Sequence, residues 1–190
     1  PLTRESLASL RGEVSALGKL VEDLNQLALA DVGALAYRKR RVDVVPLLEQ
    51  ALESFRDRLA ERHLAVETAL GREAIVFGDA DRLLQMFRNL LENSARYTDA
   101  GGRVRASARR EGDRVVVDFE DSAPGVPPEA LPHLFERFYR VDASRSRANG
   151  GAGLGLAICR SIAAAHDGEM SASDSPLGGL RVRITLPFAA

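Results

Sequence analysis

The chain is poor in the residues that cross-link proteins or bind metal ions. Its 190 residues include one cysteine, Cys159, and three histidines, His63, His133 and His166. A single cysteine excludes an internal disulfide bond and suits a reducing compartment, and we expect Cys159 to be a small buried helix residue. The histidines do not cluster with cysteine or carboxylate residues at metal-ligand spacings, so the sequence predicts no zinc site.

Long apolar runs and an excess of either charge are also missing. No stretch of about 18 apolar residues is present, and no signal peptide is recognisable. The formal net charge of −1 creates no field that would attract nucleic acid. The composition, 45% hydrophobic and 28% charged, is that of a globular protein with one compact domain and a smaller part. Because Pro1 stands within the approach to a helix, we expect a fragment of a longer protein.

The N-terminal 36 residues predict one long helix over about residues 3–30. Apolar residues recur there at alternating spacings of three and four, at Leu7, Leu10, Val14, Leu17, Val21 and Leu24. Leu20 and Leu27 widen this heptad stripe, as in a bundle helix. The helix needs a partner, either a helix preceding this chain, a second chain, or its own domain. Residues 37–41 predict a solvated basic linker.

Residues 42–190 predict an α+β domain. Helices are expected near 46–63, 80–97 and 153–166, with a partly helical segment over 127–138 and a long polar loop over 140–152. Short strands are expected just after 42 and near 65–69 and 73–77. Two hairpins follow, with strands at 104–109 and 115–120, and at 169–174 and 180–186. This mixed order indicates an antiparallel-rich sheet with helices on one face.

A glycine-rich segment, 150–156, runs directly into the helix expected at 153–166. It reads Gly-Gly-Ala-Gly-Leu-Gly-Leu. Glycine lets backbone amides approach a ligand closely, and a helix N-terminus adds unpaired N–H groups and a positive dipole end. Together they can cradle phosphate, although such segments also serve as hinges.

Three further patterns carry polar chemistry. Asn89, Asn93 and Arg96 share one side of a helix, either as Mg²⁺ and phosphate ligands or as a solvated polar face. Asp121 ends a strand before a Pro-Gly turn, where its carboxylate can accept a hydrogen bond from an adenine amine or form an Asx-turn.

In the third pattern Phe135 and Phe138 are expected to anchor one end of a mobile loop. This loop carries Arg140, Arg145 and Arg147, cations suited to bidentate phosphate contact or to solvent. Because glycines stand at its far end, the loop is a candidate lid.

The order of these four patterns resembles the N, G1, F and G2 boxes of sensor histidine kinases. The amino-acid sequence of residues 121–126 and 134–140 looks especially like that of envelope-stress sensors. The resemblance implies a two-layer α/β sandwich, the Bergerat or GHKL ATP-binding fold, over residues 42–190. It implies that residues 1–36 are the second helix of a dimerisation and histidine-phosphotransfer domain.

The resemblance also implies the residues of an ATP site. The nucleotide-binding residues would be Asn89, Asn93, Arg96, Tyr97, Asp121, Gly125, Arg140, Arg145, Gly151, Gly153, Leu154, Gly155, Leu156 and Thr185. Asn93 would coordinate Mg²⁺, and Asp121 would accept from the adenine amine. Asn89, Arg140 and Arg145 would be the catalytic set, with both arginines near the γ-phosphate.

Two departures from the family pattern matter. Ala123 replaces the first glycine of the usual Asp-x-Gly-x-Gly, while Gly125 keeps the second. No His-Glu/Asp-x-x-x-Pro segment is present, so the phosphoacceptor histidine is expected outside this chain, and His63, His133 and His166 are expected to be structural.

Alternative functions are an ATP hydrolase of the same fold or a regulatory module without kinase activity. Hydrolases place a general-base Glu where this chain has Asn89, and an amide cannot take up a proton at neutral pH.

The partners implied by the resemblance are ATP, Mg²⁺, a cognate response regulator and a second copy of the full-length protein. We expect the cytoplasmic domain of an inner-membrane sensor, joined to the membrane only through segments absent from this chain.

Overall fold

The computed structural model describes residues 4–141 and 152–190, and the side chains of residues 4–9, 15 and 16 are not described. It consists of two compact units, one ending at Ala36 and the other beginning at Tyr37. Among the described residues, no helix has the length and apolar character needed to cross a membrane.

The first unit is essentially one helix, α1 (Arg4–Asp31). Most of the heptad stripe expected on it is exposed where its side chains are described, although Leu27, which widens the stripe, is buried. The exposed members are Leu10, Val14, Leu17, Val21 and Leu24, which are between 39% and 69% exposed. The helix therefore presents an apolar face to solvent along at least four turns, and its stability as a helix depends on more than its own packing.

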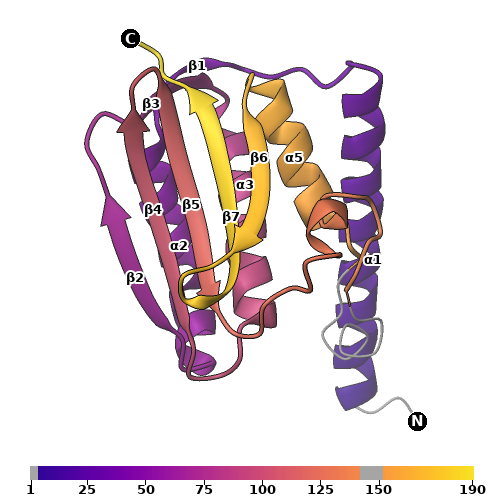
Figure 1. Ribbon diagram of the computed structural model, residues 1–190. Helices are drawn as coiled ribbons and strands as arrows, with labels where there is room; N and C mark the ends of the chain where they lie inside the picture. Colours follow the sequence, from indigo (N-terminus) through magenta and orange to yellow (C-terminus); the bar gives the residue numbers. More distant parts are fainter. Residues whose placement is uncertain (1–3, 142–151) are drawn as a thin grey trace. The chain divides into compact units, whose positions relative to one another are not determined.

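The second unit is built on a five-stranded sheet with the order β2-β4-β5-β7-β6. Its strands, in chain order, are β2 (Ala65–Leu70), β4 (Arg103–Glu111), β5 (Arg114–Ser122), β6 (Glu169–Asp174) and β7 (Gly178–Pro187). β2 pairs with β4 in parallel, and the other pairs are antiparallel. Helices α2 (Val44–Glu61), α3 (Ala80–Tyr97) and α5 (Gly155–Ala165) cover one face (Figure 1). The predicted α+β fold with helices on one face is confirmed.

A two-stranded sheet of β1 (Arg40–Asp43) and β3 (Ile75–Gly78) lies beside the main sheet. Arg40 and Arg41, expected in the linker, belong to β1 and pair with Gly78 and Phe77. They read as linker because both arginines are exposed and only Val42 of this short strand is buried. α2 follows at once, capped by Asp43, whose carboxylate accepts from the Val45 N–H at 3.1 Å.

The core lies between the main sheet and its helices. α3 contributes Met86, Phe87, Leu90 and Leu91, all fully or almost fully buried, and the Phe87 ring lies 6.0 Å from that of Phe119 on β5. α5 packs on α3 with Ile158 and Ile162. Truncating such a residue, for example Phe87→Ala, costs about 3–5 kcal/mol of stability, so α3 is held firmly against the sheet.

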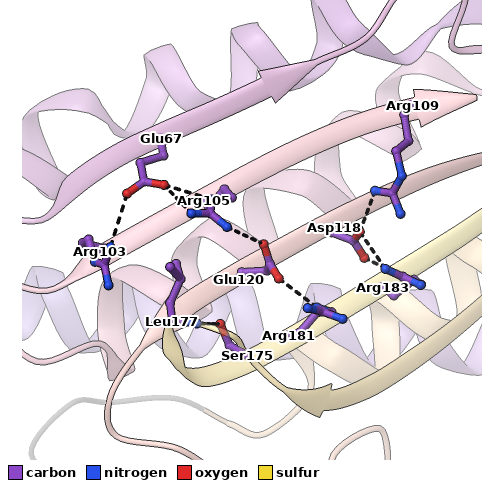
Figure 2. Close-up of polar contacts among 10 residues, drawn as sticks. All are labelled: Glu67, Arg103, Arg105, Arg109, Asp118, Glu120, Ser175, Leu177, Arg181 and Arg183. Atoms are coloured by element: carbon purple, nitrogen blue, oxygen red, sulfur yellow. Dashed lines mark hydrogen bonds and ion pairs between the residues drawn. The ribbon is translucent and has the colours of Figure 1, made fainter.

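The face of the sheet opposite the helices carries an ion-pair network (Figure 2). Asp118 on β5 is bound by two arginines: Arg183 Nε lies 2.7 Å from Oδ1, and Arg109 Nη1 lies 2.8 Å from Oδ2. Burial alone would raise the pKa of Asp118, but the hydrogen bonds from Arg183 and Arg109 lower it. Arg181 Nε donates to Glu120 Oε1 at 2.8 Å. The network leaves this face covered by charged side chains.

The segment over 127–138, expected to be partly helical, contains a short 3-10 helix, η1 (Leu131–His133), and no α-helix. Two prolines precede it, at 127 and 128, and a third lies inside it at 132. Proline cannot donate the backbone hydrogen bonds that would extend this turn into an α-helix. Leu134 is buried just after η1.

Candidate functional site

Asp121 is the buried carboxylate at the end of β5, and two elements hold it. Its side chain is 7% exposed. Leu180 N–H of β7 donates to Oδ1 at 2.8 Å, and the Ser94 hydroxyl of α3 donates to Oδ2 at 3.4 Å. Burial raises the pKa of Asp121 to about 6, and the hydrogen bonds from Leu180 and Ser94 offset only part of this effect. The carboxylate is thus desolvated, and no cation among the described residues compensates its charge.

Two residues around Asp121 were not found by sequence reasoning. Ser94 lies on the buried side of α3, and a polar group on a buried face needs a partner. Gly179 lies so close that a Cβ there would overlap Asp121 Oδ1. Gly125, by contrast, has room, because its Cβ would meet the Gly178 carbonyl oxygen at 3.5 Å, an ordinary contact.

The asparagine side of α3 is partly covered by α5. Asn89 and Asn93 are both half-buried. The Asn89 side chain hydrogen bonds to the thiol of Cys159 on α5, and Cys159 Sγ lies 3.6 Å from the Met86 carbonyl oxygen. Complete burial raises the pKa of the Cys159 thiol, so it stays protonated, in agreement with its expected structural role. Asn89 therefore also serves the α3–α5 contact.

Arg96 and Tyr97, at the end of α3, are differently placed. Arg96 Nη2 pairs with Glu92 one turn earlier at 2.6 Å, and Arg58 of α2 binds the same carboxylate. Burial would raise the pKa of Glu92, but hydrogen bonds from Arg58 and Arg96 lower it. The guanidinium expected at phosphate is thus engaged in an ion pair in this structure. Tyr97 is 40% exposed.

The two ends of the candidate lid meet through their backbones. Phe138 N–H donates to the Gly153 carbonyl oxygen at 2.9 Å. Gly153 has φ +71°, and a Cβ there would lie 2.9 Å from the Phe138 carbonyl carbon, so this position requires glycine. The Phe138 ring is 57% exposed. The expected anchor is therefore corrected at Phe138, whose backbone rather than its ring closes the loop, while Phe135 is half-buried and Leu134 is buried.

The other described residues of the glycine-rich segment lead into α5. Leu154 is buried and caps the helix, Gly155 is its first residue, and Leu156 is half-buried. At the start of the lid, Nε and Nη2 of Arg140 are buried and have no hydrogen-bond partner among the described residues. Buried guanidinium nitrogens without a partner are costly, which makes Arg140 a candidate for binding an anion. Arg145 and Gly151 lie outside the described residues.

Thr185 lies far from Asp121 in the fold, although both were predicted to be near the adenine. It pairs with Val116, five residues before Asp121 along β5, which is roughly 17 Å at about 3.4 Å per residue. It also alternates with the buried Ile184 and Leu186, which places it on the opposite face of the sheet.

Two of the three histidines, His166 and His133, contact neighbouring groups of the fold. His166 is buried against the N-terminus of α3, and His133 Nδ1 pairs with Glu136 at 2.7 Å. Within residues 4–141 and 152–190, no group of three or more His, Cys, Asp or Glu side chains is arranged to hold a metal ion.

The family model described as Histidine kinase-, DNA gyrase B-, and HSP90-like ATPase matches residues 78–190. The chain is 54% identical over 186 residues to the signal transduction histidine-protein kinase BaeS of Escherichia coli (strain K12), covering 98% of this chain and 40% of that protein. It is 37% identical over 186 residues to the sensor protein SphS of Synechococcus elongatus, covering 94% of this chain and 45% of that protein. The chain thus spans less than half the length of these two relatives.

Solved structures of two kinases resemble the whole chain. The Acinetobacter baumannii histidine kinase AdeS superposes with a TM-score of 0.83 at 27% identity, covering 100% of this chain and 87% of that one. Full-length ShkA in complex with AMPPNP superposes with a TM-score of 0.84 at 30% identity, covering 100% of this chain and 40% of that one.

Proposed function

Because the chain belongs to the family of histidine kinase-, DNA gyrase B- and HSP90-like ATPases, we propose that it is the ATP-binding part of a sensor kinase that phosphorylates a histidine outside this chain. The observation that carries the proposal is Asp121, a buried carboxylate whose charge no cation in residues 4–141 or 152–190 compensates. Such a group needs a neutral hydrogen-bond donor, and the exocyclic amine of adenine is one.

The phosphates of ATP would lie toward the residues around α3 and the lid. Arg140 would supply buried guanidinium nitrogens to a phosphate oxygen, together with Arg145 on the lid and the backbone amides of 151–156. Asn93, with Asn89 beside it, would contribute an amide oxygen to Mg²⁺. When bound, the metal ion would neutralise charge on the transferring phosphoryl group.

The reaction requires a nucleophile from elsewhere. The γ-phosphoryl group would leave the β-phosphate oxygen of ATP and form a bond to an imidazole nitrogen, with release of the imidazole proton and ADP. A response-regulator aspartate would then receive the phosphoryl group. We place this chain on the cytoplasmic side, as one domain of an inner-membrane sensor in which two copies would pair through helices that include α1.

Nucleotide-dependent thermal shift tests the binding step. We expect Mg–ATP to raise the melting temperature of the wild-type chain, since a ligand at about 100 times its Kd adds about 2.7 kcal/mol. Asp121→Asn should lose most of this shift, and Asn93→Ala should lose the part that depends on Mg²⁺. Ser171→Ala, an exposed substitution on β6, is the control. A wild-type chain that neither ATP nor ADP stabilises would refute the proposal.

Transfer of a γ-labelled phosphoryl group tests the chemistry. The chain alone should acquire no label, and an added helix with a His-Glu-x-x-x-Pro segment should acquire it only when Asn93 and Asp121 are intact. An ATP hydrolase would instead release labelled phosphate without any acceptor, which is the outcome that would favour the alternative.

A further inference from the structure

We propose that Ser94 is a positioning residue for adenine recognition: its hydroxyl, fixed in the core on α3, holds Asp121 Oδ2 as a charged acceptor for the adenine amine. The inference rests on the proposed function of Asp121 and adds to it a second residue that touches no ligand itself.

Ser94 is a polar residue on an otherwise apolar face. It is 3% exposed and lies on the same side of α3 as Leu90 and Leu91. A helical serine commonly returns its hydroxyl to a carbonyl of its own helix. Here the hydroxyl instead donates to Asp121 Oδ2, 27 residues away, at 3.4 Å. Because this hydrogen bond joins α3 to β5, it links the position of the carboxylate to α3, the helix that also carries Asn93.

The two oxygens of Asp121 have different surroundings. Oδ1 accepts from Leu180 N–H at 2.8 Å, and Gly179 lies so close to it that even a Cβ would overlap. Oδ2 faces Ser94, whose single O–H leaves the remaining lone pairs of this oxygen for a ligand. Leu180 N–H and the Ser94 hydroxyl therefore fix the carboxylate from both sides, and Oδ2 is the acceptor that remains.

Ser94 also acts on the charge of the carboxylate. The groups that determine its ionisation are Leu180 N–H from β7 and the Ser94 hydroxyl from α3, and no charged side chain in the described part of the chain contributes. Since Leu180 occupies Oδ1, a proton taken up by Asp121 goes to Oδ2 and removes the acceptor. Hydrogen bonds to the charged form oppose this protonation, so loss of the hydroxyl raises the pKa of Asp121.

The experiment compares the pH dependence of ADP binding between wild type and Ser94→Ala from pH 5 to 8.5. The ratio of the two dissociation constants cancels the titration of the nucleotide phosphates. We expect Ser94→Ala to weaken ADP binding about 3- to 10-fold near pH 6. At pH 8.5 the affinity of the variant should approach that of the wild type, because Asp121 is ionised in both proteins. The effect is modest because 3.4 Å is long for a hydroxyl–carboxylate hydrogen bond.

Two further variants separate the inference from the proposed function. In the Asp121→Asn background, the effect of adding Ser94→Ala on ADP affinity should not vary with pH, because the titrating group is gone. Ser171→Ala should reproduce the wild-type profile. A ratio that is flat with pH, with Asp121→Asn still impaired, overturns the role of Ser94 alone. Normal ADP binding by Asp121→Asn overturns the proposed adenine contact as well.

Discussion

At the scale of single residues, Asp121 is expected to trade stability for binding. Its pKa is about 6 in the folded chain and 3.8 unfolded, so between these values the folded chain binds more protons. Stability therefore falls as pH rises from 4 to 6 and stays reduced above pH 6. A shift of roughly two units corresponds to about 3 kcal/mol. Asp121→Asn should recover most of this at pH 8 and little at pH 4.

Urea unfolding of the ligand-free chain at the two pH values measures this difference. The asparagine amide can keep both neighbours, accepting from Leu180 N–H and donating to the Ser94 hydroxyl oxygen. The same variant should lose its stabilisation by nucleotide. A variant that is destabilised at pH 8 relative to wild type would contradict a desolvated, uncompensated carboxylate.

Residue chemistry was predictable from the sequence where it depends on chain neighbours. Asp121 stood out because it ends a strand before a Pro-Gly turn. Ser94 did not, because its role appears only when β5 lies against α3. The ion pair of Arg96 with Glu92 follows from helical spacing, but Arg58 comes from 34 residues earlier and another helix.

At the scale of elements, His166 joins the end of α5 to the start of α3. Its Nδ1 lies 2.7 Å from the Ile162 carbonyl oxygen, and Asp79 N–H donates to its Nε2 at 2.9 Å. Since Nε2 accepts, the ring is neutral with the proton on Nδ1, and burial lowers its pKa. The folded pKa lies below the unfolded value of 6.5, so the neutral ring contributes stability above pH 6.5 that is lost as pH falls.

Asp121 titrates in an overlapping range with the opposite sign, so the test uses the Asp121→Asn background. There, stability should fall as pH is lowered from 7 to 5, and adding His166→Gln should flatten that dependence. Unfolding free energies at both pH values provide the measurement. An equal fall with and without His166 would assign the acid sensitivity to other groups.

Element boundaries were predictable where local capping and amphipathic periodicity agree. α3 has the expected bounds because Asp79 caps it, accepting from Asp81 and Arg82 N–H, and its apolar side is continuous. The start of β1 was placed too late because its first two residues are exposed arginines, and its partner was not predicted because pairing with β3 joins segments more than 30 residues apart. Periodicity carries no information about such a long-range partner.

At the scale of the whole molecule, the two faces of the main sheet have separate tasks. The helix face buries the core and Asp121, while the opposite face is closed by arginines that neutralise Asp118 and Glu120. Within the described part of the chain, the buried carboxylates of this strand are compensated on one face and not on the other, and this contrast supports Asp121 as part of the proposed site. That contrast needs three-dimensional partners and is invisible in a charge count.

The exposed apolar stripe on α1, in the first unit, predicts self-association. The stripe on α1 exposes Val14 at 69% and Val21 at 61%, one heptad apart, and a seam of this spacing packs against another helix. We expect the chain to self-associate with increasing concentration in sedimentation velocity, and Val14→Glu with Val21→Glu to keep it monomeric. Arg11→Glu, an exposed change on the same helix with the same shift of two charges, should still self-associate. If the double variant associates as strongly as wild type, α1 is not the contact, and pairing in the full-length protein must use other helices.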